Sequence, residues 1–85
     1  MINVSDYYQS TAINTIDFND NDQQLTLTYT TNPNKEYTYN ANEYYPSIKE
    51  VIYKRLNTQK EYPTSTNSIG AYIYYLRNFE YLVDA

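Results

Sequence analysis

Two of the side chains that enzymes use most often for chemistry are missing from this chain. It has no histidine and no cysteine, so the commonest general base and the best nucleophile are both absent. Ser68 has no basic residue beside it, and its place before an apolar helical pattern is typical of a helix cap. No pattern places two carboxylates on one concave face. The sequence therefore predicts a protein that is not an enzyme.

One acidic run invites comparison with a calcium-binding loop. It contains Asp17, Asn19, Asn21 and Asp22. A calcium loop needs glycine at its sixth position and glutamate at its twelfth, and here Asp22 and Thr28 stand there. The run instead predicts a solvated turn. We expect no metal and no cofactor.

The most distinctive side chain of this protein is tyrosine. Thirteen of its 85 residues are tyrosine, against two phenylalanines and no tryptophan. Each tyrosine is a large rigid ring with a hydroxyl that needs water or a partner, and a domain this small cannot bury thirteen of them. Because exposed tyrosine is typical of binding surfaces, we expect a non-enzymatic protein-interaction module.

The expected contact surface lies on the last helical segment, residues 68–83. Apolar residues fall on most faces of this segment, which is more than one sheet and one short helix would cover. Its exposed side chains are of types enriched at binding hot spots. The predicted protein-binding residues are Tyr74, Tyr75, Arg77, Asn78 and Tyr81. A homodimer through the same helix is an alternative.

A nucleic-acid interface is the other alternative. Four of the six basic residues lie within 49–60, and tyrosines on a sheet can stack bases. The residues of this alternative are Tyr29, Tyr37, Tyr39, Lys49, Lys54, Arg55 and Lys60. The net charge of −4 opposes phosphate binding, so protein binding is the preferred interpretation.

Alternating residues predict three strands. Residues 25–31 place Leu25, Leu27 and Tyr29 on one face and threonines on the other. In residues 12–18 the apolar positions are spaced by three and then two, which predicts a bulge or a twist. A third strand is expected over residues 36–40, with turns at 19–22 and 32–34.

Two helices follow. The first is expected over residues 47–57, because Ile48, Val51, Ile52 and Leu56 form one apolar stripe. Ser47 and Glu50 have the spacing of a capping box at its start. The second is expected over residues 68–83. Its predicted core stripe is Ile69, Tyr72, Ile73, Leu76 and Val83.

The whole chain, 1–85, is predicted to be a single domain. Residues 1–10 are a polar N-terminal segment, and residues 11–41 form a three-stranded antiparallel meander followed by two helices packed on it. The expected class is therefore α+β. No signal-peptide pattern and no membrane-length apolar run is present, so a cytoplasmic protein with no membrane partner is expected.

Several short motifs occur in a familiar order. They are Ser10, Ile13, Ile16 and Phe18 with Asp17 before it, then Leu25–Tyr29, Tyr37-Thr38-Tyr39, Ile52-Tyr53-x-x-Leu56, and Ser68, Gly70 and Tyr72. Together they make the chain resemble the KTSR domain, a small and poorly characterised module of bacterial and phage proteins. The name-giving Lys-Thr-Ser-Arg is replaced by Gln9-Ser10-Thr11-Ala12. The resemblance implies a fold, and by analogy a phage or mobile-element protein that inhibits a host enzyme or defence complex.

Overall fold

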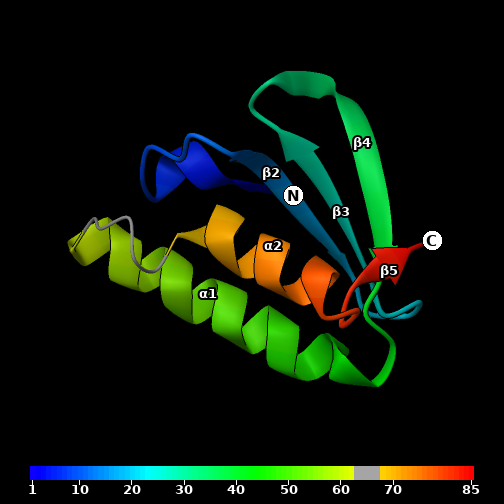
Figure 1. The fold of residues 1–85 in the computed structure, drawn as a ribbon. Coiled ribbons are helices and arrows are strands. Elements are labelled where there is room, and N and C mark those ends of the chain that lie inside the picture. Colours follow the sequence, from blue (N-terminus) through cyan, green and yellow to red (C-terminus); the bar gives the residue numbers. More distant parts are fainter. Residues whose placement is uncertain (63–67) are drawn as a thin grey trace.

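Two helices cover one face of an antiparallel sheet in this protein (Figure 1). The computed structural model describes residues 1–62 and 68–85. The sheet order is β1 (Ile2–Asn3), β2 (Ile13–Asn19), β3 (Gln24–Tyr29), β4 (Asn32–Asn40) and β5 (Val83–Asp84). The helices are α1 (Tyr45–Glu61) and α2 (Ile69–Asn78), with two short 3₁₀ helices, η1 (Val4–Asp6) and η2 (Asn42–Tyr44).

The predicted α+β class and its two helices are confirmed, but the sheet has five strands where three were predicted. The two additional strands lie at the sheet edges and are two residues long. Ile2 of β1 pairs with Ile16, and Asp84 of β5 pairs with Tyr39. Strands this short have no room for an alternating pattern, so sequence periodicity does not reveal them.

The predicted bulge in the first long strand is confirmed. The β2–β3 register passes from Ile13 opposite Tyr29 to Thr15 opposite Thr28. The extra residue lets Ile13 and Ile16, which are three positions apart, both point into the core, where they are 2% and 0% exposed.

The turn predicted at residues 32–34 is wrong, because β4 begins at Asn32. The chain reverses at Thr30 and Thr31 instead. Pro33 is compatible with a strand here because β5 pairs only with Tyr39 and Asn40, which leaves this part of β4 on the sheet edge.

Helix α1 begins earlier and ends later than predicted. It starts at Tyr45 and includes Pro46 in its first turn, a position that proline favours. Ser47 therefore lies inside the helix, and the predicted capping box of Ser47 and Glu50 is wrong. Because apolar periodicity identifies the buried face but not the first residue, the helix was recognised and its start was misplaced.

The N-terminus of α2 is capped from two sides. The Ser68 hydroxyl accepts a hydrogen bond from the Ala71 N–H at 3.1 Å, which confirms the predicted cap. The Tyr8 hydroxyl accepts from the Ile69 N–H at 2.9 Å. The N-terminal segment, predicted only as polar, thus contributes to helix capping, and its Val4 is fully buried.

Helix α2 ends at Asn78, not near residue 83. Glu80 has a positive φ of 62°, its N–H donates to the Arg77 carbonyl, and the Tyr81 N–H donates to the Leu76 carbonyl at 2.8 Å. This pair of bonds is a Schellman motif. It reverses the chain, so Leu82 enters the core at 2% exposure while Val83, a predicted core residue, is 39% exposed.

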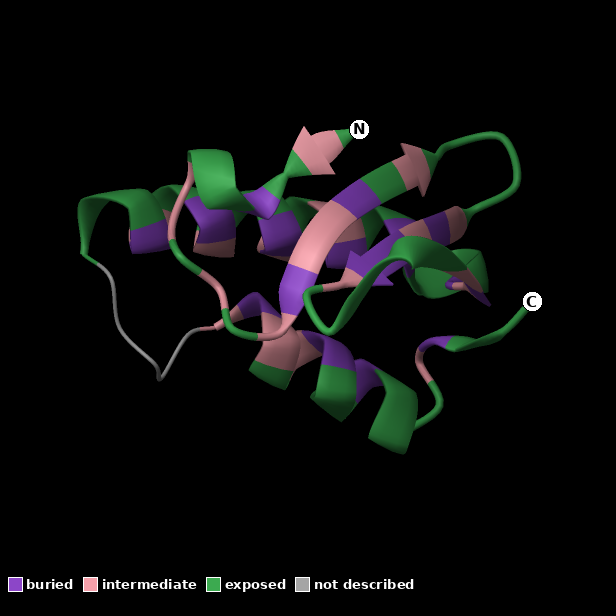
Figure 2. Cartoon of the chain, turned by 90° about the horizontal axis from the view of Figure 1, so that it is seen from above, coloured by how far each residue is buried: buried purple, intermediate pink, exposed green. Residues whose placement is uncertain are grey.

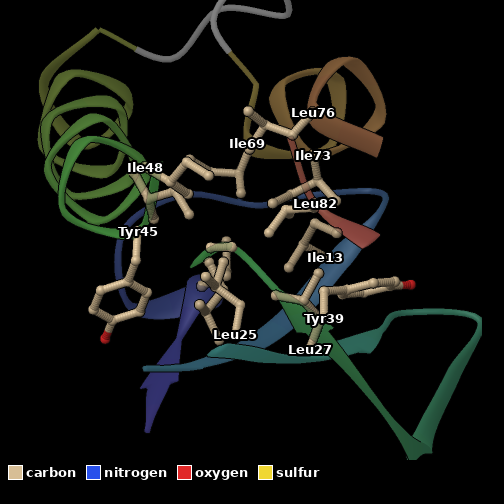
Figure 3. Close-up of a cluster of buried hydrophobic side chains, with 14 of the residues drawn as sticks. Ile13, Leu25, Leu27, Tyr39, Tyr45, Ile48, Ile69, Ile73, Leu76 and Leu82 are labelled. Carbon is tan, nitrogen blue, oxygen red and sulfur yellow. The ribbon is translucent and has the colours of Figure 1, made fainter. Parts of the chain in front are cut away.

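The core lies between the sheet and the helices. Figure 3 shows Leu25, Leu27 and Tyr39 of the sheet facing Ile73 and Leu82 on the helical side. Figure 2 shows the buried positions interrupted by intermediate or exposed ones along the strands and gathered on one side of each helix. Polar side chains lie on the opposite face of the sheet, where Thr15 bonds Thr28.

Candidate protein-binding surface

Four aromatic rings meet where α2 ends and α1 begins. They are Tyr44, Tyr75, Phe79 and Tyr81, and we call them the aromatic cluster. Ring centres lie 4.8 Å apart for Tyr44 and Tyr81, 5.0 Å for Tyr75 and Phe79, and 6.1 Å for Tyr75 and Tyr81. Tyr44, Tyr75 and Phe79 are 42%, 47% and 61% exposed. The rings support one another while keeping much of their surface in solvent.

The fold assembles this cluster from distant positions. Helices α1 and α2 lie side by side and run in opposite directions, so the start of α1 meets the end of α2 (Figure 1). The short helix η2 delivers Tyr44 to this end. The Schellman turn at Glu80 brings Tyr81 back against Tyr75.

A groove continues from the cluster along the outer side of the two helices. One hollow of about 240 Å³ is lined by Arg55, Ala71, Tyr72 and Tyr75. A second, of about 300 Å³, is lined by Val51, Lys54, Arg55 and Thr58. Arg55 belongs to both, and its guanidinium carbon lies 4.7 Å from the centre of the Tyr72 ring. Because Tyr75 borders the first hollow, the groove and the aromatic cluster form one continuous surface.

Charge is unevenly distributed along this surface. Lys54 and Arg55 lie at the groove end. Glu43 and Glu80 are exposed and adjoin Tyr44 and Tyr81 at the cluster end. The surface therefore carries basic side chains along the two hollows, Arg55 bordering both, and exposed acidic residues that precede Tyr44 and Tyr81 in the chain.

The predicted contact residues do not share one face. Tyr75 and Tyr81 come together in the aromatic cluster. Arg77 turns toward the sheet, with its guanidinium carbon 4.9 Å from the Tyr39 ring centre and a nitrogen 3.9 Å from the Asp84 carboxylate. Tyr74 is 73% exposed and lies about 100° around the helix from Tyr75. Asn78 is exposed at the last residue of α2.

Sequence reasoning did not assign Tyr44 to the contact surface. Tyr44 and Tyr45 are adjacent, but Tyr45 is 5% exposed and packs against Phe18, whereas Tyr44 is exposed and packs against Tyr81. A tyrosine pair at a helix start gives no indication of which ring turns inward. Phe79 was not assigned to the contact set either.

The sheet tyrosines of the nucleic-acid alternative lie on the helix-facing side, not on an open platform. Together with Arg77 and Asp84, Tyr29, Tyr37 and Tyr39 line a separate cleft of about 310 Å³. Tyr39 is only 2% exposed, and its hydroxyl bonds that of Tyr29 at 3.0 Å. Burial, followed by this hydrogen bond, raises the pKa of Tyr39 well above its usual range. A ring so buried leaves no face on which a base could stack.

All four basic residues of that alternative lie on α1, and each has a different neighbour. Lys49 donates to the Asp20 carboxylate at 2.8 Å, and its nitrogen lies 5.5 Å from the Phe18 ring centre. That hydrogen bond raises the pKa of Lys49 and lowers the pKa of Asp20. Arg55 lies instead over a ring of α2, and Lys60 over Tyr7 near the N-terminus. Lys54 lines one hollow with Arg55 and another, of about 470 Å³, with Lys60. Three of the four cations therefore lie along neighbouring hollows of α1, and Lys49 is paired with an acid instead.

Two further features bear on ligands. Within residues 1–62 and 68–85, no group of three or more acidic side chains is placed to hold a metal ion. Among the helices of the same residues, none has the length and apolar content needed to cross a bilayer.

Comparison with known proteins gives no relative: no family model, no curated protein and no solved structure matches this chain. The similarity to the KTSR domain therefore stays a prediction based on the order of its motifs.

Proposed function

We propose that this protein is a non-enzymatic interaction module that binds another protein through the aromatic cluster and the adjoining groove. The observation that carries the proposal is the packing of four partly exposed rings against one another at the end of the helical layer. Aromatic rings held in place by their neighbours lose little conformational freedom on binding, and such rings are typical hot spots.

The composition of the surface supports this role. Its centre is aromatic and its ends are charged, as in interfaces with an apolar core and a polar rim. The largest exposed apolar patch on a monomer is often functional. Histidine and cysteine, the commonest general base and the best nucleophile, are absent from the sequence.

A finer proposal concerns the biological setting. The motif order resembles a module of bacterial and phage proteins, so we propose a phage or mobile-element protein that binds, and inhibits, a host enzyme or defence complex. The acidic N-terminal half would steer it toward a basic partner surface. This step rests on analogy with small acidic proteins of such elements.

The proposal is tested by capture of partners from a lysate of the natural host. We expect Tyr75→Ala combined with Phe79→Ala to remove the captured protein, with or without nuclease treatment. The control is Tyr62→Ala, because Tyr62 is more exposed than Tyr75 or Phe79, at 72%, but lies at the far end of α1. Both variants should keep melting temperatures within a few degrees of the wild type, since surface substitutions change stability by about 0.5 kcal/mol or less. Undiminished capture by the folded double variant would contradict the proposed surface.

Nucleic-acid binding remains the second candidate, favoured only by the cations of α1. It predicts captured material that disappears on nuclease treatment and binding that weakens steeply with salt. Binding through a tyrosine-centred protein interface should change little with nuclease treatment or with salt concentration.

A further inference from the structure

We propose that a second copy of this chain covers the aromatic cluster and groove, with the two α2 helices antiparallel about a two-fold axis near Tyr75. This inference rests on the proposed function for its choice of surface and adds a regulation of it. Self-association and partner binding would compete, so that the surface is covered when no partner is present.

The spacing of side chains along α2 supports the two-fold arrangement. Phe79 is four residues after Tyr75 and Ala71 is four residues before it, so all three lie along one side of the helix. An antiparallel axis at Tyr75 therefore places Phe79 of each copy opposite Ala71 of the other. Phe79 is the most exposed ring of the cluster at 61%, and Ala71 lines the hollow of about 240 Å³. The exposed Phe79 ring of each copy would thus meet the small Ala71 side chain of the other copy, at the edge of that copy's hollow. The two-fold axis makes this contact occur twice in the dimer.

The charges select the same orientation. In the antiparallel arrangement Lys54 and Arg55 of one copy approach Glu43 and Glu80 of the other. A parallel arrangement would bring basic ends together and acidic ends together, which is unfavourable. The surface is therefore complementary to itself in only one of the two orientations.

The available area indicates a weak dimer. A buried aromatic ring contributes about 150–250 Å², so the four partly exposed rings offer roughly 350 Å² per copy. With the groove and its charged ends the contact stays near the lower limit of specific interfaces, about 600 Å² per partner. We expect dissociation in the micromolar to submillimolar range, which leaves a partner able to displace the second copy.

Sedimentation equilibrium between about 5 µM and about 500 µM should show a monomer–dimer equilibrium, a range chosen for such a small interface. Arg55→Glu and Glu80→Arg, made singly, should each weaken the dimer about tenfold or more, and the double variant should recover most of the loss. The control is Lys35→Glu, because Lys35 also lies over a tyrosine ring but is on β4. It changes the net charge as Arg55→Glu does and should leave the dimer intact.

A steric variant tests the interface without changing charge. Ala71→Trp should fill the hollow and abolish dimerisation, and its folded state is checked by an unchanged melting temperature because Ala71 is exposed. A wild type that stays monomeric at the highest concentration, or an Ala71→Trp variant that dimerises normally, would overturn the proposal. A monomeric wild type that still captures a partner through Tyr75 and Phe79 would refute the dimer and support the proposed function.

Discussion

Gly70 lies at the N-terminal end of α2, where the helix passes the start of β2. A Cβ atom added to Gly70 would lie 2.7 Å from the Cβ of Ala12, closer than real Cβ atoms approach. Since the obstructing atom belongs to alanine, it has no rotamer by which to move away. The only glycine of the chain is therefore explained by helix–strand packing.

This contact reverses the usual effect of a glycine substitution. In an exposed helix Gly→Ala stabilises by about 1 kcal/mol, but Gly70→Ala should destabilise by about 1–3 kcal/mol because the helix must shift. Urea unfolding measures the difference. Adding Ala12→Gly should recover part of the loss relative to the two single variants. A Gly70→Ala protein more stable than the wild type would contradict the close packing.

Glu80 provides an opposite test, because here a residue with a side chain adopts the conformation that glycine prefers. At φ 62° it occupies the position after α2 where glycine is usual. Glu80→Gly should stabilise by about 0.5–1 kcal/mol, after allowing for the greater freedom of glycine in the unfolded chain. Thermal unfolding should show a rise of roughly 2–8 °C. Asn42→Gly is the control, since Asn42 has a similar φ of 52° and asparagine tolerates it, so its gain should be smaller.

At the scale of elements, the sequence predicts the strands and helices whose apolar residues recur at a regular spacing. It misses features that have no such spacing, such as the turn that ends α2. Alternation over residues 24–29 and the apolar stripe of α1 extend over enough positions to identify the buried faces. Helix α2 was predicted five residues too long, because Tyr81 and Leu82 continue the apolar spacing after the backbone has turned at Glu80. Such a turn normally contains glycine, and a glutamate there gives no indication of it.

The candidate site was only partly predictable for the same reason. Tyr75 and Tyr81 were both assigned to the contact surface, but on the assumption that Tyr81 was helical. Their meeting depends on the turn at Glu80. The participation of Tyr44 depends on the antiparallel packing of α1 and α2, which brings the start of one helix to the end of the other. Arg77 was assigned by residue type, whereas its direction is set by Tyr39 and Asp84.

For the whole molecule, the tyrosine content predicts a loss of stability in alkali. Burial, together with hydrogen bonds to Tyr29 and Asp20 respectively, raises the pKa of Tyr39 and of Tyr45 far above the usual value of about 10. Both rings are within the core at 5% exposure or less. In the unfolded chain they ionise normally, so the folded state binds more protons above pH about 10.

The direction of the stability change with pH follows from these raised pKa values. A raised folded pKa gives a contribution that is complete below pH about 10 and is lost as the pH rises, by about 1.4 kcal/mol per pH unit for each such tyrosine. Urea midpoints should therefore fall steeply between pH about 10 and about 12. Tyr39→Phe, which has no hydroxyl to ionise, should show a shallower fall than the wild type.

The phenolate absorbance gives a second readout of the same effect. Tyr39 and Tyr45 should titrate in one cooperative step that coincides with the loss of circular dichroism, because burial raises their pKa and their hydroxyls ionise only when the core opens. If the absorbance showed no such step while the secondary structure persisted, the sealed positions of Tyr39 and Tyr45 would be wrong. The division of tyrosines between core and contact surface, on which both proposals depend, would then fail with them.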